Sequence, residues 1–276
     1  MNNDLQISVG VASYAPWLRL GKASLQDFVF KCVELGFTAI EPCDRTIVST
    51  ETFYLKQMQA FFRREGVAIP CLDVRNDFTV KDADEWESNV QHVLDWIRAA
   101  HEMNVPVIRI WAGVRSVDNE APNRVLRAVE RLIPVAERYG VLLAMENHGG
   151  VSSNPDWLAR LVRYINSAYF GTCPDFGHLA ADDRYEGLEK LIPLSFHIHA
   201  KVHGFRDDGE EAEMDYSRIM RMVGELNRPV YVSIEYEGET KDVQDNIAGI
   251  LKTHELIRKH WSIKQCRKQL EVARAL

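Results

Sequence analysis

Short apolar runs alternate along the chain with longer segments in which apolar residues recur every three or four positions. The short runs have the length and composition of β-strands, whereas the longer segments have the period of amphipathic helices. Eight strands are predicted, over residues 7–13, 37–43, 67–74, 105–113, 141–147, 169–175, 196–202 and 229–237. Strands that alternate with helices form parallel sheets, and eight consecutive βα units predict a closed α/β fold, the (β/α)8 TIM barrel.

Start and stop signals mark several of the predicted helices. Ser24 and Asp27 form the pattern of a capping box, and Gly36 stands where that helix would end. Asn154 followed by Pro155 predicts a second helix start, because proline is favoured in the first helical turn. Further helical segments are predicted over residues 51–65, 84–103 and 122–139.

No linker or low-complexity segment divides the chain, which predicts a single domain over residues 1–276. We expect the barrel to occupy about residues 5–260 and a C-terminal helix to occupy about residues 261–276. The basic and apolar tail from Lys252 to Leu276 predicts a helix or helix pair that contacts another subunit or packs across the barrel bottom. An open doubly wound sheet is the alternative fold, but no GxGxxG motif follows the first strand.

Side chains alternate between the two faces of a strand, and the polar residues of several predicted strands share one face. In the seventh strand, His197, His199 and Lys201 share a face while apolar residues occupy the other. The other side chains predicted to point into the barrel are Tyr231, Ser233, Glu235, Glu237, Arg109 and Trp111. Buried charges need partners or a metal ion, so this polar interior predicts a functional site.

The composition agrees with one large domain: 276 residues, of which 46% are hydrophobic and 26% charged. The formal net charge of −7 disfavours an extended surface for nucleic acid or an anionic membrane. The chain begins without a signal-peptide pattern, and no apolar run approaches the roughly 20 residues of a membrane span. Five cysteines without a CxxC pair favour a reducing compartment, so a cytoplasmic protein is predicted.

Four of the predicted strands, the fifth to the eighth, each end on a potential metal ligand. These residues are Glu146, Asp175, His199 and Glu235. Their spacing is close to the roughly 31 residues of one βα unit, and all C-terminal strand ends of a barrel face the same mouth. The sequence therefore predicts one metal site built from three carboxylates and one imidazole.

Each of the four ligands also has a structural interpretation when it is taken alone. Glu146 could cap a helix, and Asp175 could initiate the turn of the DFGH segment. His199 could be a core histidine bonded to a backbone carbonyl, and Glu235 could pair with Lys201 or with the arginine of the fourth strand. The shared parity, strand-end position and spacing favour the joint metal site.

The segments MENHGG, PDFGH, HIHAKVH and SIEYEG resemble the sugar-phosphate isomerase/epimerase superfamily. This superfamily of xylose-isomerase-like TIM barrels includes ketose 3-epimerases, hydroxypyruvate isomerase and inosose dehydratase. The resemblance runs from about residue 5 to 260, and it implies that the four ligands bind one divalent ion.

The resemblance also implies residues that contact substrate. His178, three residues after the aspartate ligand, is similar to a substrate-binding histidine, and Arg206 is the nearest candidate for an arginine that grips a hydroxyl. Glu41 stands where many members carry a substrate-facing acid, with a salt bridge to Arg45 as the alternative. Lys201, Arg109 and Trp111 are further candidates for contacts with the substrate, and His148 for a supporting position behind the ligands.

The ligand types favour Mn²⁺ or Mg²⁺, with Zn²⁺ or Co²⁺ as alternatives. The predicted activity is an isomerase or epimerase that acts on a small sugar, keto-sugar or polyol through an enediolate. Glu146 and Glu235 would be the acid and base on opposite sides of the substrate. The sequence leaves the oligomeric state open, with a homo-oligomer (dimer or tetramer) among the expectations.

Two other activities fit parts of the pattern. A dehydratase of the inosose or dehydroshikimate type would use the same ligands to eliminate water. An apurinic-site endonuclease has a related barrel but needs three zinc ions and more histidines. Asp73 and Trp111 stand near strand ends where those histidines would be expected, so the nuclease is the remote alternative.

Overall fold

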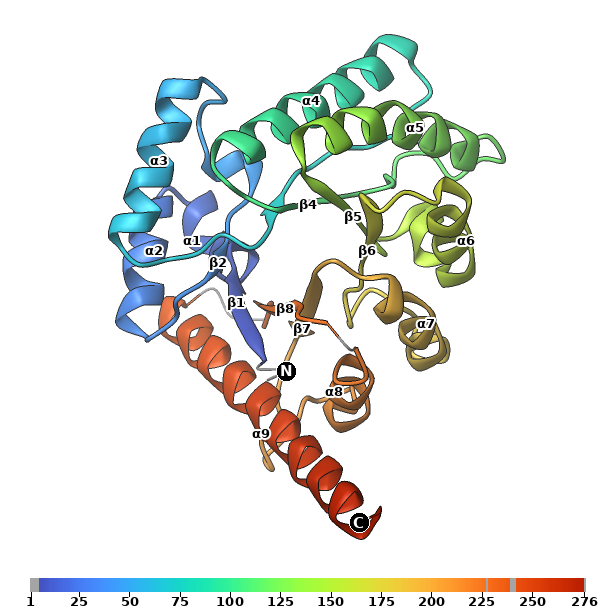
Figure 1. The fold of residues 1–276 in the computed structure, drawn as a ribbon. Helices are drawn as coiled ribbons and strands as arrows, with labels where there is room; N and C mark the ends of the chain where they lie inside the picture. Colours follow the sequence, from blue (N-terminus) through green and yellow to red (C-terminus); the bar gives the residue numbers. More distant parts are fainter. Residues whose placement is uncertain (1–4, 227, 239–241, 276) are drawn as a thin grey trace.

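The computed structural model describes residues 5–226, 228–238 and 242–275, with the backbone alone for 262–275. Eight parallel strands form a ring with the helices outside it (Figure 1). The strands are β1 (Gln6–Gly10), β2 (Ile40–Glu41), β3 (Leu72–Asp73), β4 (Val107–Ile110), β5 (Leu142–Glu146), β6 (Phe170–Cys173), β7 (Ile198–Val202) and β8 (Tyr231–Tyr236). The α-helices are α1 (Ala15–Arg19), α2 (Leu25–Glu34), α3 (Thr52–Arg64), α4 (Ala83–Glu102), α5 (Ala121–Tyr139), α6 (Pro155–Ile165), α7 (Arg184–Leu191), α8 (Tyr216–Val223) and α9 (Val243–Ala275).

The strands pair in two parallel groups, β2-β1-β8-β7 and β3-β4-β5-β6. Isolated parallel bridges join the groups, one of them between Cys43 and Asp73 and another between Asp175 and His199. The predicted (β/α)8 TIM barrel is therefore confirmed. The second and third strands are shorter than predicted, and Pro42 and Pro70 lie in these segments, where each removes an N–H from the ladder.

The predicted helix signals act as expected. The Ser24 hydroxyl accepts a hydrogen bond from the backbone N–H of Asp27, while the Asp27 carboxylate accepts one from the N–H of Ser24. The Asn154 side chain caps α6 by accepting from the backbone N–H of Trp157. Gly140 ends α5 in the left-handed conformation, with a φ of 67°.

The C-terminal helix differs from its predicted boundaries. It begins at Val243 and continues to Ala275 as one helix, so the eighth helix of the barrel and the predicted extension are continuous. Its first part packs against β8 and α8, and its far end reaches past the ring of helices (Figure 1). Among the described residues, no helix is long and apolar enough to cross a membrane.

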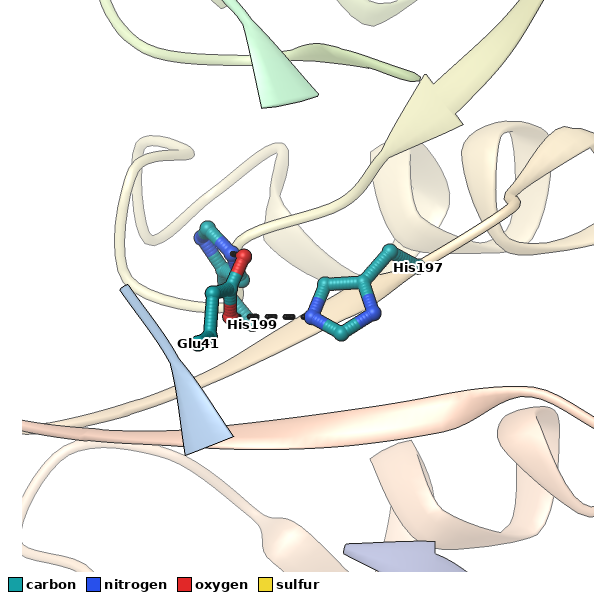
Figure 2. Close-up of side chains that lie close together, drawn as sticks. All are labelled: Glu41, His197 and His199. Carbon is teal, nitrogen blue, oxygen red and sulfur yellow. Dashed lines mark hydrogen bonds and ion pairs between the residues drawn. The ribbon is translucent and has the colours of Figure 1, made fainter. Parts of the chain in front are cut away.

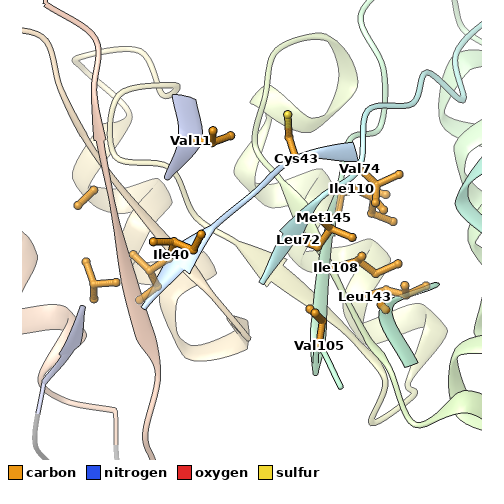
Figure 3. Close-up of a cluster of buried hydrophobic side chains, with 14 of the residues drawn as sticks. Val11, Ile40, Cys43, Leu72, Val74, Val105, Ile108, Ile110, Leu143 and Met145 are labelled. Atoms are coloured by element: carbon orange, nitrogen blue, oxygen red, sulfur yellow. The ribbon is translucent and has the colours of Figure 1, made fainter. Parts of the chain in front are cut away.

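The apolar faces of the strands pack outward against the helices. Figure 3 shows one layer of this core, with Leu72, Ile108, Leu143 and Met145 on neighbouring strands. The register pairs Ile108 with Leu72 on one side and with Leu143 on the other. These contacts fix the strands in the orientation that turns the alternate side chains inward.

The inward side chains form two layers. Small apolar residues fill the barrel toward the N-terminal ends of four strands, and all of them are buried: Cys71, Val107, Ala144 and Cys173. Two residues later along the same segments, the inward positions are polar or charged: Asp73, Arg109, Glu146 and Asp175. The lower layer closes the barrel, and the upper layer forms the floor of its mouth.

Candidate metal centre

The structure brings the four predicted ligands together at the C-terminal ends of β5 to β8. One donor atom from each of Glu146, Asp175, His199 and Glu235 lies within 4.8 Å of the others, and all four residues are buried. A cavity of about 690 Å³ opens above them and is lined by Glu146 and Glu235, among others. Three carboxylates and one imidazole form a hard donor set suited to Mn²⁺ or Mg²⁺.

The two oxygens of Asp175 have different surroundings. Oδ1 accepts a hydrogen bond of 2.7 Å from the backbone N–H of Gly177, so the turn predicted for this segment is formed. Oδ2 is buried and has no hydrogen-bond partner among the described residues. It lies 3.4 Å from Nδ1 of His178 and 3.5 Å from Nζ of Lys201. A cation at the four donors would supply the missing partner, so the residues fit a metal ion.

His199 is oriented through its second nitrogen. Its Nε2 lies 3.0 Å from Oε1 of Glu41, and its Nδ1 lies 3.0 Å from Oε1 of Glu146 and 3.6 Å from Oε1 of Glu235. Figure 2 shows Glu41 beside both this ring and His197, whose Nε2 lies 2.9 Å from the other carboxylate oxygen. A carboxylate that holds one imidazole nitrogen leaves the other free to bind a metal.

Glu41 therefore has a different position from the two that were predicted. It is completely buried and bonds to His197 and His199, so it neither lines the cavity nor pairs with Arg45. Burial would raise the pKa of Glu41, but the two histidines hold it well below its usual range. The strand-end rule located Glu41 correctly, while its partners are more than 150 residues away in the sequence and come together only in the closed barrel.

Glu146 is held by two residues of the fourth βα unit. The Nε1–H of Trp111 donates a hydrogen bond of 2.6 Å to its Oε2, and Nε of Arg109 lies 3.4 Å from the same oxygen. Arg109 also pairs with the buried carboxylate of Asp73 at 2.6 Å. Burial would raise the pKa of Glu146, but Arg109, His178 and His199 hold it well below its usual range. Glu146 is thus a fixed carboxylate.

Glu235 lies against Lys201 and the end of the first strand. The Lys201 ammonium donates to Oε2 of Glu235 at 2.6 Å and to Oε1 of Glu237 at 2.8 Å. A side chain at Gly10 would place its Cβ 3.2 Å from Cγ of Glu235, so glycine there leaves room for the carboxylate. Burial would lower the pKa of Lys201, but Glu235 and Asp175 raise it well above its usual range.

Two histidines line the cavity beside the ligands. His148 stacks on Trp111, with ring centroids 4.2 Å apart and planes 4° from parallel. Its Nδ1 lies 3.1 Å from Nδ1 of His178, and burial lowers the pKa of His148 to about 4. Burial would also lower the pKa of His178, but Asp175 and Glu146 raise it. His148 thus lines the cavity beside Glu146, rather than lying only behind the ligands.

Arg206 lies apart from this cavity. Its side chain is exposed and pairs with Asp208 in the loop after β7, where it borders a separate hollow that includes Glu210 and His260. Arg206 lies in the loop after β7, where strand alternation no longer fixes the direction of a side chain. The course of the loop therefore decides its position. The structure therefore removes Arg206 from the candidate site.

Several residues of the site were given no role in it from the sequence. Asp73 ends β3 just as Glu41 ends β2, so the strand-end rule could have selected it. Two asparagines were also not predicted, and each forms two hydrogen bonds with the backbone of a residue on a neighbouring segment. Asn147 bonds both the N–H and the carbonyl of Asp175, and Asn76 bonds both groups of Trp111. Each amide extends the strand pairing to the mouth of the barrel.

Comparison with known proteins agrees with this architecture. A family model described as "Xylose isomerase-like TIM barrel" matches residues 29–260. The chain belongs to this family. A search of curated proteins found no significant match.

Solved structures of similar fold include enzymes of two kinds and a zinc-bound protein. D-psicose 3-epimerase from Clostridium cellulolyticum H10, described with D-tagatose, has 13% identity and a TM-score of 0.77, over 93% of this chain and 99% of that one. IolI with a bound zinc atom has 17% identity and a TM-score of 0.75, over 94% and 98%. The probable 3-DHS dehydratase AsbF from Bacillus anthracis has 13% identity and a TM-score of 0.68, over 91% and 98%. At these identities the likeness concerns the fold.

Proposed function

We propose that this chain is a divalent-metal-dependent isomerase or epimerase that acts on a small keto-sugar or related polyol. The observation that carries the proposal is the set of four buried donor atoms within 4.8 Å of one another at the floor of a cavity of about 690 Å³. A cavity of this volume is large enough for a small sugar. The family includes sugar epimerases, which supports the substrate class.

Glu146, Asp175, His199 and Glu235 would hold the ion. When bound, a divalent ion supplies a Lewis acid that stabilises negative charge on substrate oxygens. Glu41 would keep Nε2 of His199 protonated, so that the lone pair of Nδ1 would be available to the ion. The choice of Mn²⁺ or Mg²⁺ follows from the oxygen-rich donors.

Glu146 and Glu235 are proposed as the proton-transfer residues. They come from β5 and β8, which are not neighbours in the barrel, and both line the cavity. One carboxylate would remove the proton from the carbon next to the carbonyl, which gives an enediolate. The other would return a proton to the opposite face, which inverts that carbon. Each transfer of this kind contributes about 10²–10⁴ in rate.

Lys201 and His178 would bind substrate hydroxyls. Lys201 donates to the carboxylates of Glu235 and Glu237, and His178 lies within 3.6 Å of Glu146. Both side chains line the cavity. The ring of Trp111 also lines the cavity and stacks on His148. Together the two rings would form one wall of the substrate-binding site.

A dehydratase is the second candidate. The probable dehydratase with the same fold supports it, and the same two carboxylates would serve an elimination. After proton removal, loss of a β-hydroxyl with a proton from the second carboxylate would release water and leave an enone. The difference depends on which substrate carbon faces Glu146 or Glu235.

Reaction in deuterated water separates these activities. The protein would be loaded with Mn²⁺ and incubated with a panel of keto-sugars and inososes, with products followed by chromatography, mass spectrometry and ultraviolet absorbance. An epimerase with two carboxylates should place close to one solvent deuterium on the inverted carbon. A product lighter by one water with an enone absorbance assigns the dehydratase. Complete retention of the substrate hydrogen would exclude the two-glutamate scheme.

A further inference from the structure

Three arginines line the cavity mouth without a carboxylate partner in the described part of the chain. Arg19 lies in the last turn of α1, Arg45 lies in the short 3-10 helix after β2 (Asp44–Thr46), and Arg75 follows β3. All three belong to the first three βα units, whereas the candidate ligands come from the ends of the last four strands. Arg19 and Arg45 are exposed, and Arg75 is half-buried.

The other charged residues of the same cavity are all paired. Asp73 pairs with Arg109, and Arg109 also reaches Glu146. Glu235 and Glu237 both pair with Lys201. Each acidic group of the lining thus has a basic partner, Arg109 or Lys201, whereas the three arginines form no ion pair with a described residue.

The nearby carboxylate of Asp44 forms its ion pair with His92 and not with these arginines. Its Oδ2 accepts a hydrogen bond of 3.1 Å from the backbone N–H of Arg75 and lies 2.8 Å from Nε2 of His92. Asp44 therefore fixes the backbone at the exit from β3, while the guanidinium of Arg75 remains available to the cavity.

Arg75 also lies close to the candidate metal centre. Its guanidinium carbon is 5.9 Å from the ring centroid of Trp111, and Trp111 donates to Glu146. A ligand between Arg75 and Glu146 would therefore pass over one tryptophan ring. Arg75 and Glu146 line the same cavity, so one small molecule could contact Glu146 with its reacting end and Arg75 with a charged end.

We infer that the substrate carries an anionic group, a carboxylate or a phosphate monoester, which binds Arg45 and Arg75 with Arg19 at the rim. This inference rests on the proposed function, because it places the reacting end of the same molecule at Glu146 and Glu235. Guanidinium groups match both anions through paired N–H donors in a plane. The substrate class is then an acidic or phosphorylated keto-sugar or polyol.

Binding of matched neutral and anionic sugars tests the inference directly. D-fructose, D-fructose 6-phosphate and D-fructuronate share carbons 1 to 5 and differ at carbon 6, and D-erythrulose with its 4-phosphate offers a shorter pair. Calorimetric titration of the Mn²⁺-loaded protein should give at least about tenfold tighter binding for an anionic member than for its neutral counterpart. Preference for the phosphate or for the carboxylate then identifies the anion.

The variants Arg45→Gln and Arg75→Gln should remove most of this preference, measured within each variant as the ratio of the dissociation constants of the neutral and the anionic sugar. Arg138→Gln, an exposed arginine on α5, is the matched control for the change in net charge. Thermal unfolding confirms that each variant is folded. The preference should persist in the control.

Two results would overturn the inference. One is equal or weaker binding of every anionic compound in both sets, and the other is an anionic preference that survives both arginine substitutions. The proposed function is scored separately, by deuterium incorporation into any neutral or anionic keto-sugar. A protein that epimerises neutral sugars with equal efficiency keeps the proposed function and loses the anionic subsite.

Discussion

The two halves of the barrel mouth contribute different parts of the candidate site. Strands β5 to β8 end in the four candidate ligands, whereas β2 to β4 lead to residues that hold those ligands. Glu41 holds His199, and Arg109 and Trp111 hold Glu146. The donor atoms thus come from the second half, and the first half orients two of them, those of His199 and Glu146. A change in either half should therefore alter the metal centre by a different amount.

The halves also differ in how their charges are matched. Lys201 lies among three carboxylates in the second half. In the first half, Arg45 and Arg75 face the cavity with no ion pair to a described residue. A charged side chain without an ion-pair partner can bind a charged group of a ligand. A metal site, in contrast, needs donor atoms that are already held in position before the ion binds. If both proposals hold, donors from the second half bind the ion and arginines from the first half bind the charged end of the substrate.

Replacement of a ligand in the second half should have the largest effect. Asp175→Asn removes a negative donor whose Oδ2 has no hydrogen-bond partner in the described part of the chain. We expect loss of tight metal binding and a fall in turnover on the order of 10⁴-fold, since Lewis-acid stabilisation is worth several kcal/mol. Elemental analysis and steady-state kinetics measure both. Asp208→Asn, an exposed aspartate beside Arg206, is the control, and full metal occupancy in the Asp175 variant would disprove the ligand assignment.

Removal of a single proton-transfer group should have the next largest effect. Glu235→Gln and Glu146→Gln are each expected to lower kcat by about 10²–10⁴-fold with a much smaller change in KM. Steady-state kinetics on any substrate that incorporates deuterium provide the measurement. A change confined to KM would indicate that these carboxylates only bind substrate.

A change in the first half should weaken the metal centre without destroying it. Glu41→Gln replaces the carboxylate that holds His199, so metal affinity should fall by about 10–100-fold. Competition with a calibrated chelator measures the affinity. Glu211→Gln is a matched control, because Glu211 is also buried but accepts backbone N–H groups of Glu213 and Met214 in another loop. Equal losses in both variants would mean that Glu41 serves stability alone.

Replacement of Asn147 or Asn76 should have the smallest effect, and the comparison of the two variants discriminates between the two halves. Asn147→Ala and Asn76→Ala each leave buried backbone groups without a partner, so each should lower the free energy of unfolding by about 1–3 kcal/mol. Thermal unfolding should show a decrease of about 2–4 °C per kcal/mol. Asn147→Ala should weaken metal binding more than Asn76→Ala, because Asn147 bonds the backbone of Asp175 itself, whereas Asn76 acts on Glu146 only through Trp111. Similar metal affinities in the two variants would contradict the division between the halves.

The positions that the sequence predicted well are those fixed by short-range rules. Strand alternation and strand ends are local properties, so Glu146, Asp175, His199 and Glu235 could be selected before any contact was known. The capping pattern of Ser24 and the glycine stop at Gly36 were equally local. The same rules placed the start of the C-terminal helix near residue 261, whereas the helix begins at Val243. A continuous helical pattern does not show where the last helix of the barrel ends and an extension begins.

Residues whose role depends on a distant partner could not be assigned from the sequence. Glu41 was located at a strand end, yet its bonds to His197 and His199 require closure of the barrel. Arg206 was selected because it follows the ligand His199 in the sequence. It lies in a loop, and its side chain borders a different hollow. The distance along the chain gives no information about such contacts, because loop lengths and side-chain rotamers decide them.

The sequence by itself determined the order of strands and helices, the closure into a barrel and the face of each strand that turns inward. It also determined which chemistry stands at the strand ends. Only the tertiary structure decided which charges are matched: Lys201 among the carboxylates, Arg109 with Asp73, and Arg75 with no ion-pair partner in the described chain. The physical reason is that periodicity fixes the direction of a side chain, whereas its partner depends on packing between segments far apart in the chain.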